Sequence, residues 1–213
     1  MTPSELSLTS VDVVALHFPA AEARPTVGVA PRPWDPEQGT LALPGVLHGR
    51  GELLTESAQR ALSAKLGAPA SAVRTVGQLR VFDAPHRDPR GPTLSIAMFA
   101  VLAADWADPA VTWIDLDDQP KLAFDHNRIL HDTRVILADK LFHDLPFTRA
   151  LLGDRFPVTR ALAAAETLHG RPVDRGNFNR TLRATPGLVR TGDTAQARGT
   201  GRPASVWRWD DAG

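Results

Sequence analysis

The pattern of strand-like and helix-like segments changes near residue 125, and this change constrains the fold more than any other feature of the sequence. Before it, short runs rich in β-branched and aromatic residues predict strands around one amphipathic helix, residues 52–66. After it, apolar residues recur at helical spacing, and two strand-like runs follow near the end of the chain. The change predicts two domains, residues 1–143 and 144–213.

The individual segments can be placed from their periodicity and from the residues that end them. Strands are expected at residues 13–18, 25–30, 73–82, 93–102 and 111–114 in the first domain. Helices are expected at 125–142, around 147–152, at 158–169, and from an N-cap at Asp174, followed by strands at 187–191 and 204–209. Helix, helix and hairpin in that order predict a winged helix-turn-helix, with Trp207 and Trp209 packed in its core.

Composition narrows the possible functions. There is no cysteine, which excludes disulfides and thiolate chemistry, and no apolar run approaches the ~18 residues that span a bilayer. We therefore expect a cytoplasmic protein without a membrane partner. Lys+Arg and Asp+Glu both total 24, but residues 145–209 hold eleven arginines against four acidic residues. The second domain is thus strongly basic, which favours a polyanionic partner.

The helix that begins after Asp174 carries the most specific part of this charge. If Phe178 and Leu182 face inward, helical geometry turns its Arg and Asn residues outward, and these side chains suit guanine and adenine edges. The Gly-rich hairpin tip adds two arginines that can reach phosphates. The alternative is a solvated helix in an arginine-rich chain. The predicted DNA-binding residues are Arg175, Asn177, Asn179, Arg180, Arg183, Arg198 and Arg202.

Residues 41–67, LALPGVLHGRGELLTESAQRALSAKLG, resemble the Nudix box, G-x5-E-x7-R-E-U-x-E-E-x-G-U. The positions that match are Glu52, Arg60, Leu62 and Gly67, and those that depart are Val46, Ala61, Ala64 and Lys65. In the resembled family, the carboxylates of the box hold Mg²⁺, a hard cation that requires several oxygen ligands. Their loss predicts no catalytic residues, no metal site and no cofactor.

Further stretches sharpen the resemblance. FDAPHRDPRG, at 82–91, resembles the loop of ADP-ribose-type Nudix domains, and LAFDHNRIL, at 122–130, resembles the start of the connecting helix in one subfamily. RPVDRGNFNRTL at 171–182, with GRPASVWRW at 201–209, resembles the winged-helix domain of that subfamily, the Nudix-related transcriptional regulators of NAD metabolism. The resemblance covers residues 13–209 and implies an α+β fold, a Nudix-like α/β/α sandwich followed by a winged helix. It further implies a homodimeric repressor that binds operator DNA with an inverted repeat and senses ADP-ribose or a related nucleotide.

Within the sandwich, the resemblance suggests a cleft for a pyrophosphate. We expect Arg50, Arg80, Arg87 and Arg90 to line it, although the turn around Arg87 and Arg90 can equally be a charged, solvated loop. Two other functions stay open. The chain can be an active hydrolase of nucleoside diphosphate derivatives, which the lost carboxylates argue against, or a regulator that senses a sugar or no ligand.

Overall fold

The structure is a computed structural model, which describes residues 7–195 and 203–210. The first domain contains β1 (Leu8–His17), β2 (Thr26–Pro31), β3 (Leu41–Ala42), β4 (Gly45–Leu47), α1 (Leu54–Leu66), the 3-10 turn η2 (Ala70–Ala72), β5 (Val73–Phe82), β6 (Thr93–Leu102), β7 (Thr112–Ile114) and α2 (His126–Lys140). The second contains α3 (Leu145–Leu152), β8 (Arg155–Pro157), α4 (Val158–His169), α5 (Arg175–Ala184), β9 (Leu188–Ala195) and β10 (Ala204–Trp209).

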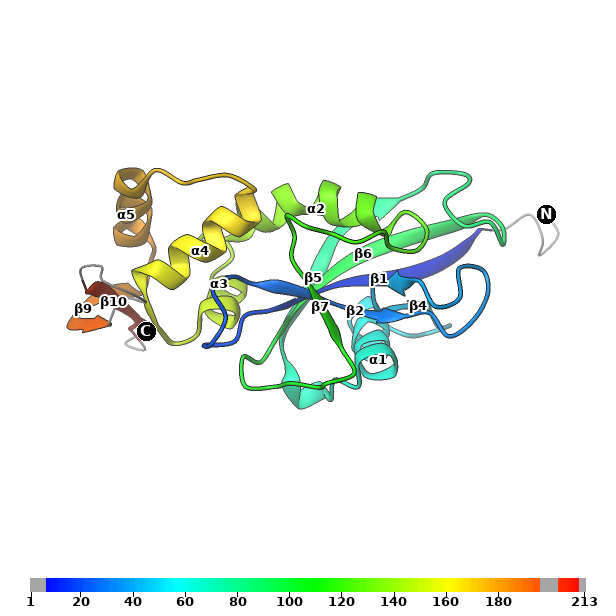
Figure 1. The fold of residues 1–213 in the computed structure, drawn as a ribbon, viewed down its shortest axis with the longest axis horizontal. Helices are drawn as coiled ribbons and strands as arrows, with labels where there is room; N and C mark the ends of the chain where they lie inside the picture. The colour runs from blue at the N-terminus through cyan, green and yellow to red at the C-terminus, as the bar shows by residue number, and fades with distance from the viewer. Residues whose placement is uncertain (1–6, 196–202, 211–213) are drawn as a thin grey trace.

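A mixed sheet forms the centre of the first domain, with strand order β3-β2-β1-β6-β5, β4 paired with β1 and β7 paired with β2. Strand β1 is buried on both faces because its apolar run is continuous. Val11 and Val13 pack on the α1 side, whereas Val14 and Leu16 belong to the cluster that includes α2 and α3. Figure 1 shows α1 and α2 on opposite faces of this sheet. The predicted α/β/α sandwich is confirmed.

Helix α1 is short and well delimited. Glu56 accepts a hydrogen bond from the backbone N–H of Leu53 at 2.8 Å, which fixes the first turn. Gly67 ends the helix in the left-handed conformation, with φ of 71°, where other residues are strained. The helix begins two residues later than the sequence predicts because Glu52 folds back onto the N–H of Gly49 at 2.9 Å.

The second domain is a winged helix, as predicted. Helices α4 and α5 pack on a three-stranded antiparallel sheet of order β8-β10-β9. Phe178 and Leu182 of α5 are buried, and so are Trp207 and Trp209 of β10, which confirms that the tryptophans belong to the core. The sequence analysis missed β8 because its three residues run directly into α4, a length too short for alternation to be recognised.

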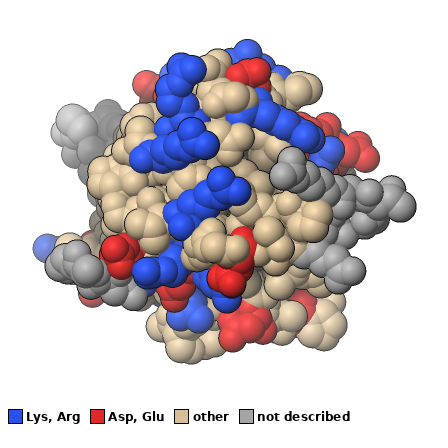
Figure 2. Space-filling view, turned by 90° about the vertical axis from the view of Figure 1, so that its left-hand side faces the viewer, with Lys and Arg blue, Asp and Glu red and all other residues tan. Residues whose placement is uncertain are grey.

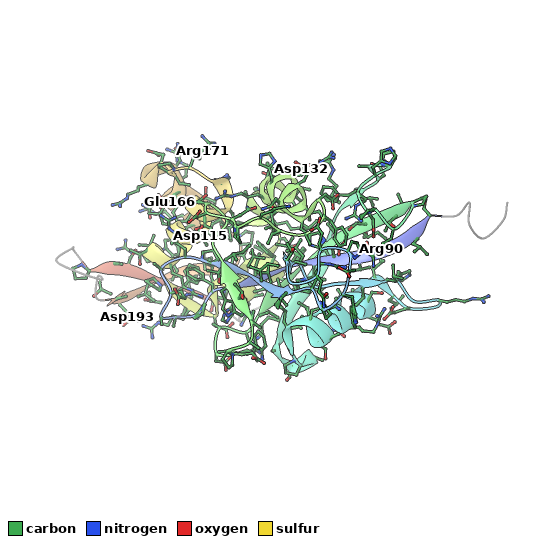
Figure 3. All side chains as sticks on the ribbon, turned by 45° about the vertical axis from the view of Figure 1, so that its right-hand side comes forward. Arg90, Asp115, Asp132, Glu166, Arg171 and Asp193 are labelled. Carbon is green, nitrogen blue, oxygen red and sulfur yellow. The ribbon has the colours of Figure 1, made fainter. Side chains whose placement is uncertain are left out.

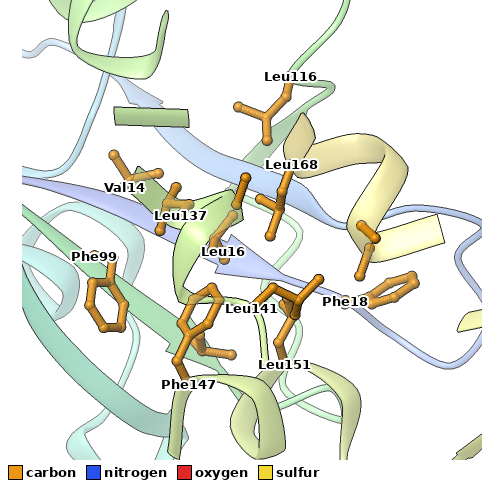
Figure 4. Close-up of a cluster of buried hydrophobic side chains, with 14 of the residues drawn as sticks. Val14, Leu16, Phe18, Phe99, Leu116, Leu137, Leu141, Phe147, Leu151 and Leu168 are labelled. Carbon is orange, nitrogen blue, oxygen red and sulfur yellow. The ribbon is translucent and has the colours of Figure 1, made fainter. Parts of the chain in front are cut away.

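The hydrophobic core continues from one domain into the other. Phe147 of α3 lies against Phe99 of the central sheet, with ring centroids 5.2 Å apart. Leu141, directly after α2, and Leu168 of α4 belong to the same buried cluster (Figure 4). The boundary predicted between residues 143 and 144 falls between α2 and α3, where no gap separates the two cores, and it stays a prediction. Among the described residues, every helix is too short or too polar to cross a membrane.

Two arginines make hydrogen bonds between the domains, and in both cases α4 is one of the two partners. Arg134 of α2 donates from Nε to the carbonyl of Thr167 at 2.9 Å, near the end of α4, and from Nη2 to Asp117 at 2.5 Å. Arg160 of α4 donates to the carbonyl of Pro19 at 3.1 Å, and its guanidinium lies 3.6 Å from the centre of the Phe18 ring. The winged helix is therefore held against the sandwich by packing and by charged hydrogen bonds.

Candidate nucleic-acid interface and ligand cavity

Helix α5 is oriented by its cap and by its buried face. Asp174 accepts a hydrogen bond from the backbone N–H of Asn177 at 2.8 Å, so it is the N-cap that the sequence predicts. The buried side chains of Phe178 and Leu182 fix the rotation of the helix. Phe178 meets Phe142 edge to face, with centroids 5.6 Å apart, and this contact anchors α5 near the end of α2.

The predicted DNA-binding residues of α5 divide into exposed and half-buried positions. Arg175, Asn177, Arg180 and Arg183 are exposed, as expected from the inward direction of the apolar pair. Asn179 is half-buried, and its side-chain amide donates to the carbonyl of Arg175 at 2.8 Å, so one of its donors is already used. The two predicted hairpin-tip residues, Arg198 and Arg202, lie outside the described residues.

A groove of about 490 Å³ runs between α5 and the β9–β10 hairpin. Arg175, Asn179 and Arg183 line it from the helix, at a spacing of four residues. Arg190 of β9 lines it from the other side, and the sequence analysis did not single it out. Its position depends on the pairing of β9 with β10 beside the helix, which local sequence does not reveal. Figure 2 shows this end of the molecule, with a broken band of Lys and Arg side chains across it.

The charges in this region are not neutralised by neighbouring acids. Among residues 7–195 and 203–210, no carboxylate lies within 4.0 Å of Arg175, Arg180, Arg183 or Arg190. The nearby ion pairs involve other arginines, such as Arg155 with Asp193 at 2.7 Å. The interface of α5 and the hairpin thus presents several guanidinium groups that are available to an external anion.

The first domain contains a cavity of about 380 Å³ at the opposite end of the molecule. In Figure 3, Arg90 of its wall lies far from Arg171 and Asp193 of the winged helix. The cavity is lined by Ser10, Asp12, Ala30, Pro31, Arg32, Pro33, Trp34, Asp35, Ala42, Leu43, Gly45, Val46, Leu47, Arg60, Lys65, Arg87, Asp88, Arg90, Phe124 and His126. Cations and two aromatic rings predominate among its large side chains, a combination that suits an anionic ligand with a ring system.

A buried polar network forms one wall of this cavity. Arg87 makes two hydrogen bonds to Asp125, at 2.7 and 3.1 Å, and its Nη2 lies 3.6 Å from Asp12. His126 accepts a hydrogen bond from the backbone N–H of Leu43 at 2.9 Å, so its proton is on Nε2, which faces Asp12 at 3.7 Å. Burial lowers the pKa of His126, which keeps the ring neutral at physiological pH.

Asp12 itself is held in place by hydroxyl groups. It accepts hydrogen bonds from Ser10 at 3.1 Å and from Ser95 at 2.5 Å. Its carboxylate lies so close to Gly45 that a Cβ at that position would clash with it. A glycine is therefore required where β4 passes this side chain.

The structure brings together two of the four predicted ligand-binding arginines. Arg87 and Arg90 line the cavity, and each is engaged by a carboxylate: Arg87 by Asp125, and Arg90 by Asp88 at 2.7 Å. Arg50, in an exposed turn, and Arg80, on β5 with its guanidinium 5.8 Å from the Phe82 ring, do not line it. The sequence alone could not show which of the four arginines line the cavity. That depends on where β5 and the turn before α1 lie in the folded domain relative to the cavity.

Arg32, Trp34, Lys65 and Phe124 line the cavity and were missed. Lys65 Nζ lies 4.8 Å from the centre of the Trp34 ring, and the Arg32 guanidinium 4.4 Å from the centre of the Phe124 ring. These residues come from the loop after β2, from α1 and from the segment just before α2. They meet only in the tertiary structure. One sequence signal was available: Trp34 stands in a Pro-rich loop, where a large aromatic residue is exposed and can mark a binding site.

The degenerate box does not fit a metal ion. Glu52 accepts hydrogen bonds on both carboxylate oxygens, from Arg60 at 2.8 and 2.7 Å and from Ser57 at 2.7 Å. The Arg60 side chain, followed by Ser57, lowers the pKa of Glu52. Ala61, Ala64 and Lys65 occupy the positions at which the Nudix box has acidic residues. Within the described part of the chain, no group of three or more His, Asp or Glu side chains could hold a metal ion.

The family model of the NrtR DNA-binding winged helix domain matches residues 148–209. These residues are similar to the NrtR winged helix. Shewanella oneidensis NrtR, solved in complex with a 27mer DNA, is similar over 95% of this chain and 93% of its own, with 25% identity and a TM-score of 0.71. The chain thus has the architecture of NrtR, a Nudix-related regulator.

Two further comparisons concern the first domain of this NrtR-like chain. The NUDIX domain of the same Shewanella NrtR, solved with ADP ribose, is 23% identical over 64% of this chain and 94% of its own, with a TM-score of 0.52, which shows the shared fold. An ADP-ribose pyrophosphatase from Methanocaldococcus jannaschii is 35% identical over 104 residues. The match covers 46% of this chain and 59% of that relative, so less than two thirds of the relative is represented.

Proposed function

We propose that this chain is a DNA-binding transcriptional repressor whose Nudix domain binds ADP-ribose or a related nucleotide. The observation that carries the proposal is the pairing, in one chain, of an NrtR winged helix with a cation-lined Nudix cavity. One relative of this architecture was solved with DNA, and its isolated NUDIX domain was solved with ADP ribose.

The DNA contact is assigned to α5 and its groove. Arg180 faces directly away from the buried Phe178 and Leu182, which is the side of a recognition helix that enters the major groove. Arg183 lies one turn further along the same exposed face, and Arg190 borders the groove beside it, where a phosphate backbone can pass. Arg198 and Arg202 remain proposed phosphate contacts of the hairpin.

One short recognition helix specifies too few base pairs for a genomic site, so we propose that the protein acts as a homodimer on an inverted repeat. The half-sites are then separated by about one turn of DNA, ~10 bp, or a multiple of it. The basic winged-helix faces would repel each other, so the dimer contact is assigned to the Nudix domain and α2.

The direct experiment is a fluorescence anisotropy titration with duplex DNA from the promoter upstream of its own gene. We expect sequence-specific binding, with a weaker and strongly salt-dependent affinity for an unrelated duplex of equal length. Equal affinity for the two duplexes would contradict a role as a specific regulator. Added ADP-ribose should release the specific duplex.

A second candidate function is hydrolysis of a nucleoside diphosphate derivative. It is favoured by the similarity to an ADP-ribose pyrophosphatase and by the retention of Glu52 and Arg60. We propose that the chain is inactive, because the carboxylates that would hold a metal are replaced and Glu52 is bound by its neighbours. ADP-ribose should survive incubation with the protein and Mg²⁺ or Mn²⁺. Metal-dependent turnover that Glu52→Gln abolishes would establish the hydrolase instead.

A further inference from the structure

The cations of the Nudix cavity are not equally available to a ligand. Five cationic side chains line it. Three of them are ion-paired, each at 2.7 Å: Arg60 with Glu52, Arg87 with Asp125, and Arg90 with Asp88. Arg32 and Lys65 have no carboxylate within 4.0 Å among residues 7–195 and 203–210. These two side chains therefore carry the cationic charge of the cavity that remains available to a ligand.

Each of these two cations rests against an aromatic ring rather than an acid. Lys65 lies over Trp34 and Arg32 over Phe124, contacts that stabilise a cation by only about 0.5–1 kcal/mol at exposed sites. Arg32 also donates from Nε to the carbonyl of Pro36 at 3.0 Å, a neutral acceptor that leaves the guanidinium without an ion pair. Arg90 also lies near Phe124, 5.5 Å from its centroid. Burial, and after it the charge of Arg90, lowers the pKa of Arg32, but an arginine stays protonated at physiological pH, so a partly buried positive charge remains for an anion to stabilise.

Two of the three aspartates that line the cavity, Asp12 and Asp88, are, in contrast, already occupied by protein donors, and so is Glu52 beside it. The third, Asp35, is exposed and would offer a divalent cation a single carboxylate. Both oxygens of Asp88 accept hydrogen bonds from Arg90, and both oxygens of Glu52 accept from Arg60. Asp12 accepts from two serine hydroxyls. A divalent cation would have to displace these donors to obtain its oxygen ligands.

We propose that Arg32 and Lys65 bind the two phosphates of a nucleoside diphosphate, and that this ligand binds without a divalent cation. The inference rests on the proposed effector function and assigns the residues and the charge balance of that site. Trp34, a residue that is 67% exposed at the cavity wall, offers a ring on which the base can stack. The ligand thereby neutralises two cations that the protein leaves without acidic partners.

Isothermal titration of the full-length protein with ADP-ribose and with ADP tests this assignment. The dissociation constants in EDTA and in excess Mg²⁺ should agree within about twofold, because the phosphates are held by side chains. Arg32→Gln and Lys65→Gln should each weaken binding about tenfold or more, equivalent to ~1.4 kcal/mol. Lys65→Arg keeps the charge and should retain most of the affinity. Lys121→Gln removes the same charge from an exposed position outside the cavity and should leave binding unchanged.

Thermal unfolding and promoter binding check that each variant is folded, since both cations lie far from α5. Wild-type affinity in both Arg32→Gln and Lys65→Gln, or binding that EDTA abolishes, would overturn this inference and leave the proposed effector function intact. If the wild-type protein binds neither ADP-ribose nor ADP under either condition, the proposed effector function and this inference are both overturned.

Discussion

Three of the four arginines that line the Nudix cavity are ion-paired, whereas the arginines of α5 have no carboxylate within 4.0 Å among the described residues. In the cavity, Arg87 is almost completely buried and makes two hydrogen bonds to Asp125. On α5, Arg180 and Arg183 are exposed, and no carboxylate of the described residues lies within 4.0 Å of them. Ion-paired arginines stabilise the fold, whereas unpaired ones are available to an external anion. The number of arginines in a segment therefore does not reveal which of them bind ligands.

The largest expected effect is a loss of stability when an ion-paired arginine of the cavity is replaced. Arg87→Ala leaves Asp125 and Asp12 without their cation in an environment where the Arg87 side chain is only 4% exposed. Removing one partner of such a buried pair costs ~3–5 kcal/mol, because the remaining charge is uncompensated. Urea unfolding should show this loss. Arg60→Ala, which breaks a pair whose arginine is 45% exposed, should cost less than ~1 kcal/mol. Equal losses would contradict the distinction.

Replacing an arginine of α5 is expected to weaken DNA binding and to leave the stability of the fold nearly unchanged. Arg180→Ala or Arg183→Ala should weaken promoter binding by ~1–3 kcal/mol if that arginine reads a base, and should relax the preference at one position per half-site. Because neither side chain has an acidic partner in the described chain, the free energy of unfolding should change by less than ~0.5 kcal/mol. Anisotropy and urea titrations of the same samples measure both. Arg50→Ala is the matched control, because Arg50 is exposed in a turn far from α5 and has no carboxylate within 4.0 Å among the described residues.

A smaller and sequence-independent effect is expected for the groove wall. Arg190→Ala should weaken binding to specific and unrelated duplexes alike and should reduce the salt slope by ~0.9, the value for one lost phosphate contact. The same result is predicted for Arg198 and Arg202. A loss confined to the specific duplex would instead make Arg190 a base-reading residue.

The smallest expected effect concerns pH. Because burial lowers the pKa of His126 below its usual 6.5, the folded protein binds fewer protons there than the unfolded chain. The resulting stability is fully present above pH 6.5 and is lost as the pH falls toward the folded-state pKa. The unfolding free energy of wild type should therefore fall more steeply below pH 6.5 than that of His126→Gln. Parallel curves would show that His126 is not the titrating group.

Much of the fold could be predicted from sequence. Residues 73–82, 93–102 and 204–209 have the predicted bounds, because each is a run of strand formers between turn residues. The cap at Asp174 was also predictable, since an N-cap depends on neighbours three residues away. Strands β3, β4 and β8, of two or three residues, carry too little pattern to be recognised.

The ligand cavity was less predictable than α5. The direction of a helix face follows from spacing along one segment, so the exposed side of α5 could be derived from Phe178 and Leu182 alone. The cavity instead joins Arg32, Lys65 and Phe124, which belong to different elements and meet only in the tertiary structure. Arg80, although close in sequence to Arg87, lies on a strand whose side chains do not reach it.

The central claim is that DNA binding and nucleotide binding are coupled within one chain. Helix α2 begins at the cavity wall with His126 and holds α4 through Arg134, so it connects the two regions. The most direct test is to measure promoter affinity with and without saturating ADP-ribose, and ADP-ribose affinity with and without saturating promoter DNA. The account predicts that each ligand weakens the other by the same factor, as linkage requires. Promoter affinity that is unchanged by bound ADP-ribose would contradict it.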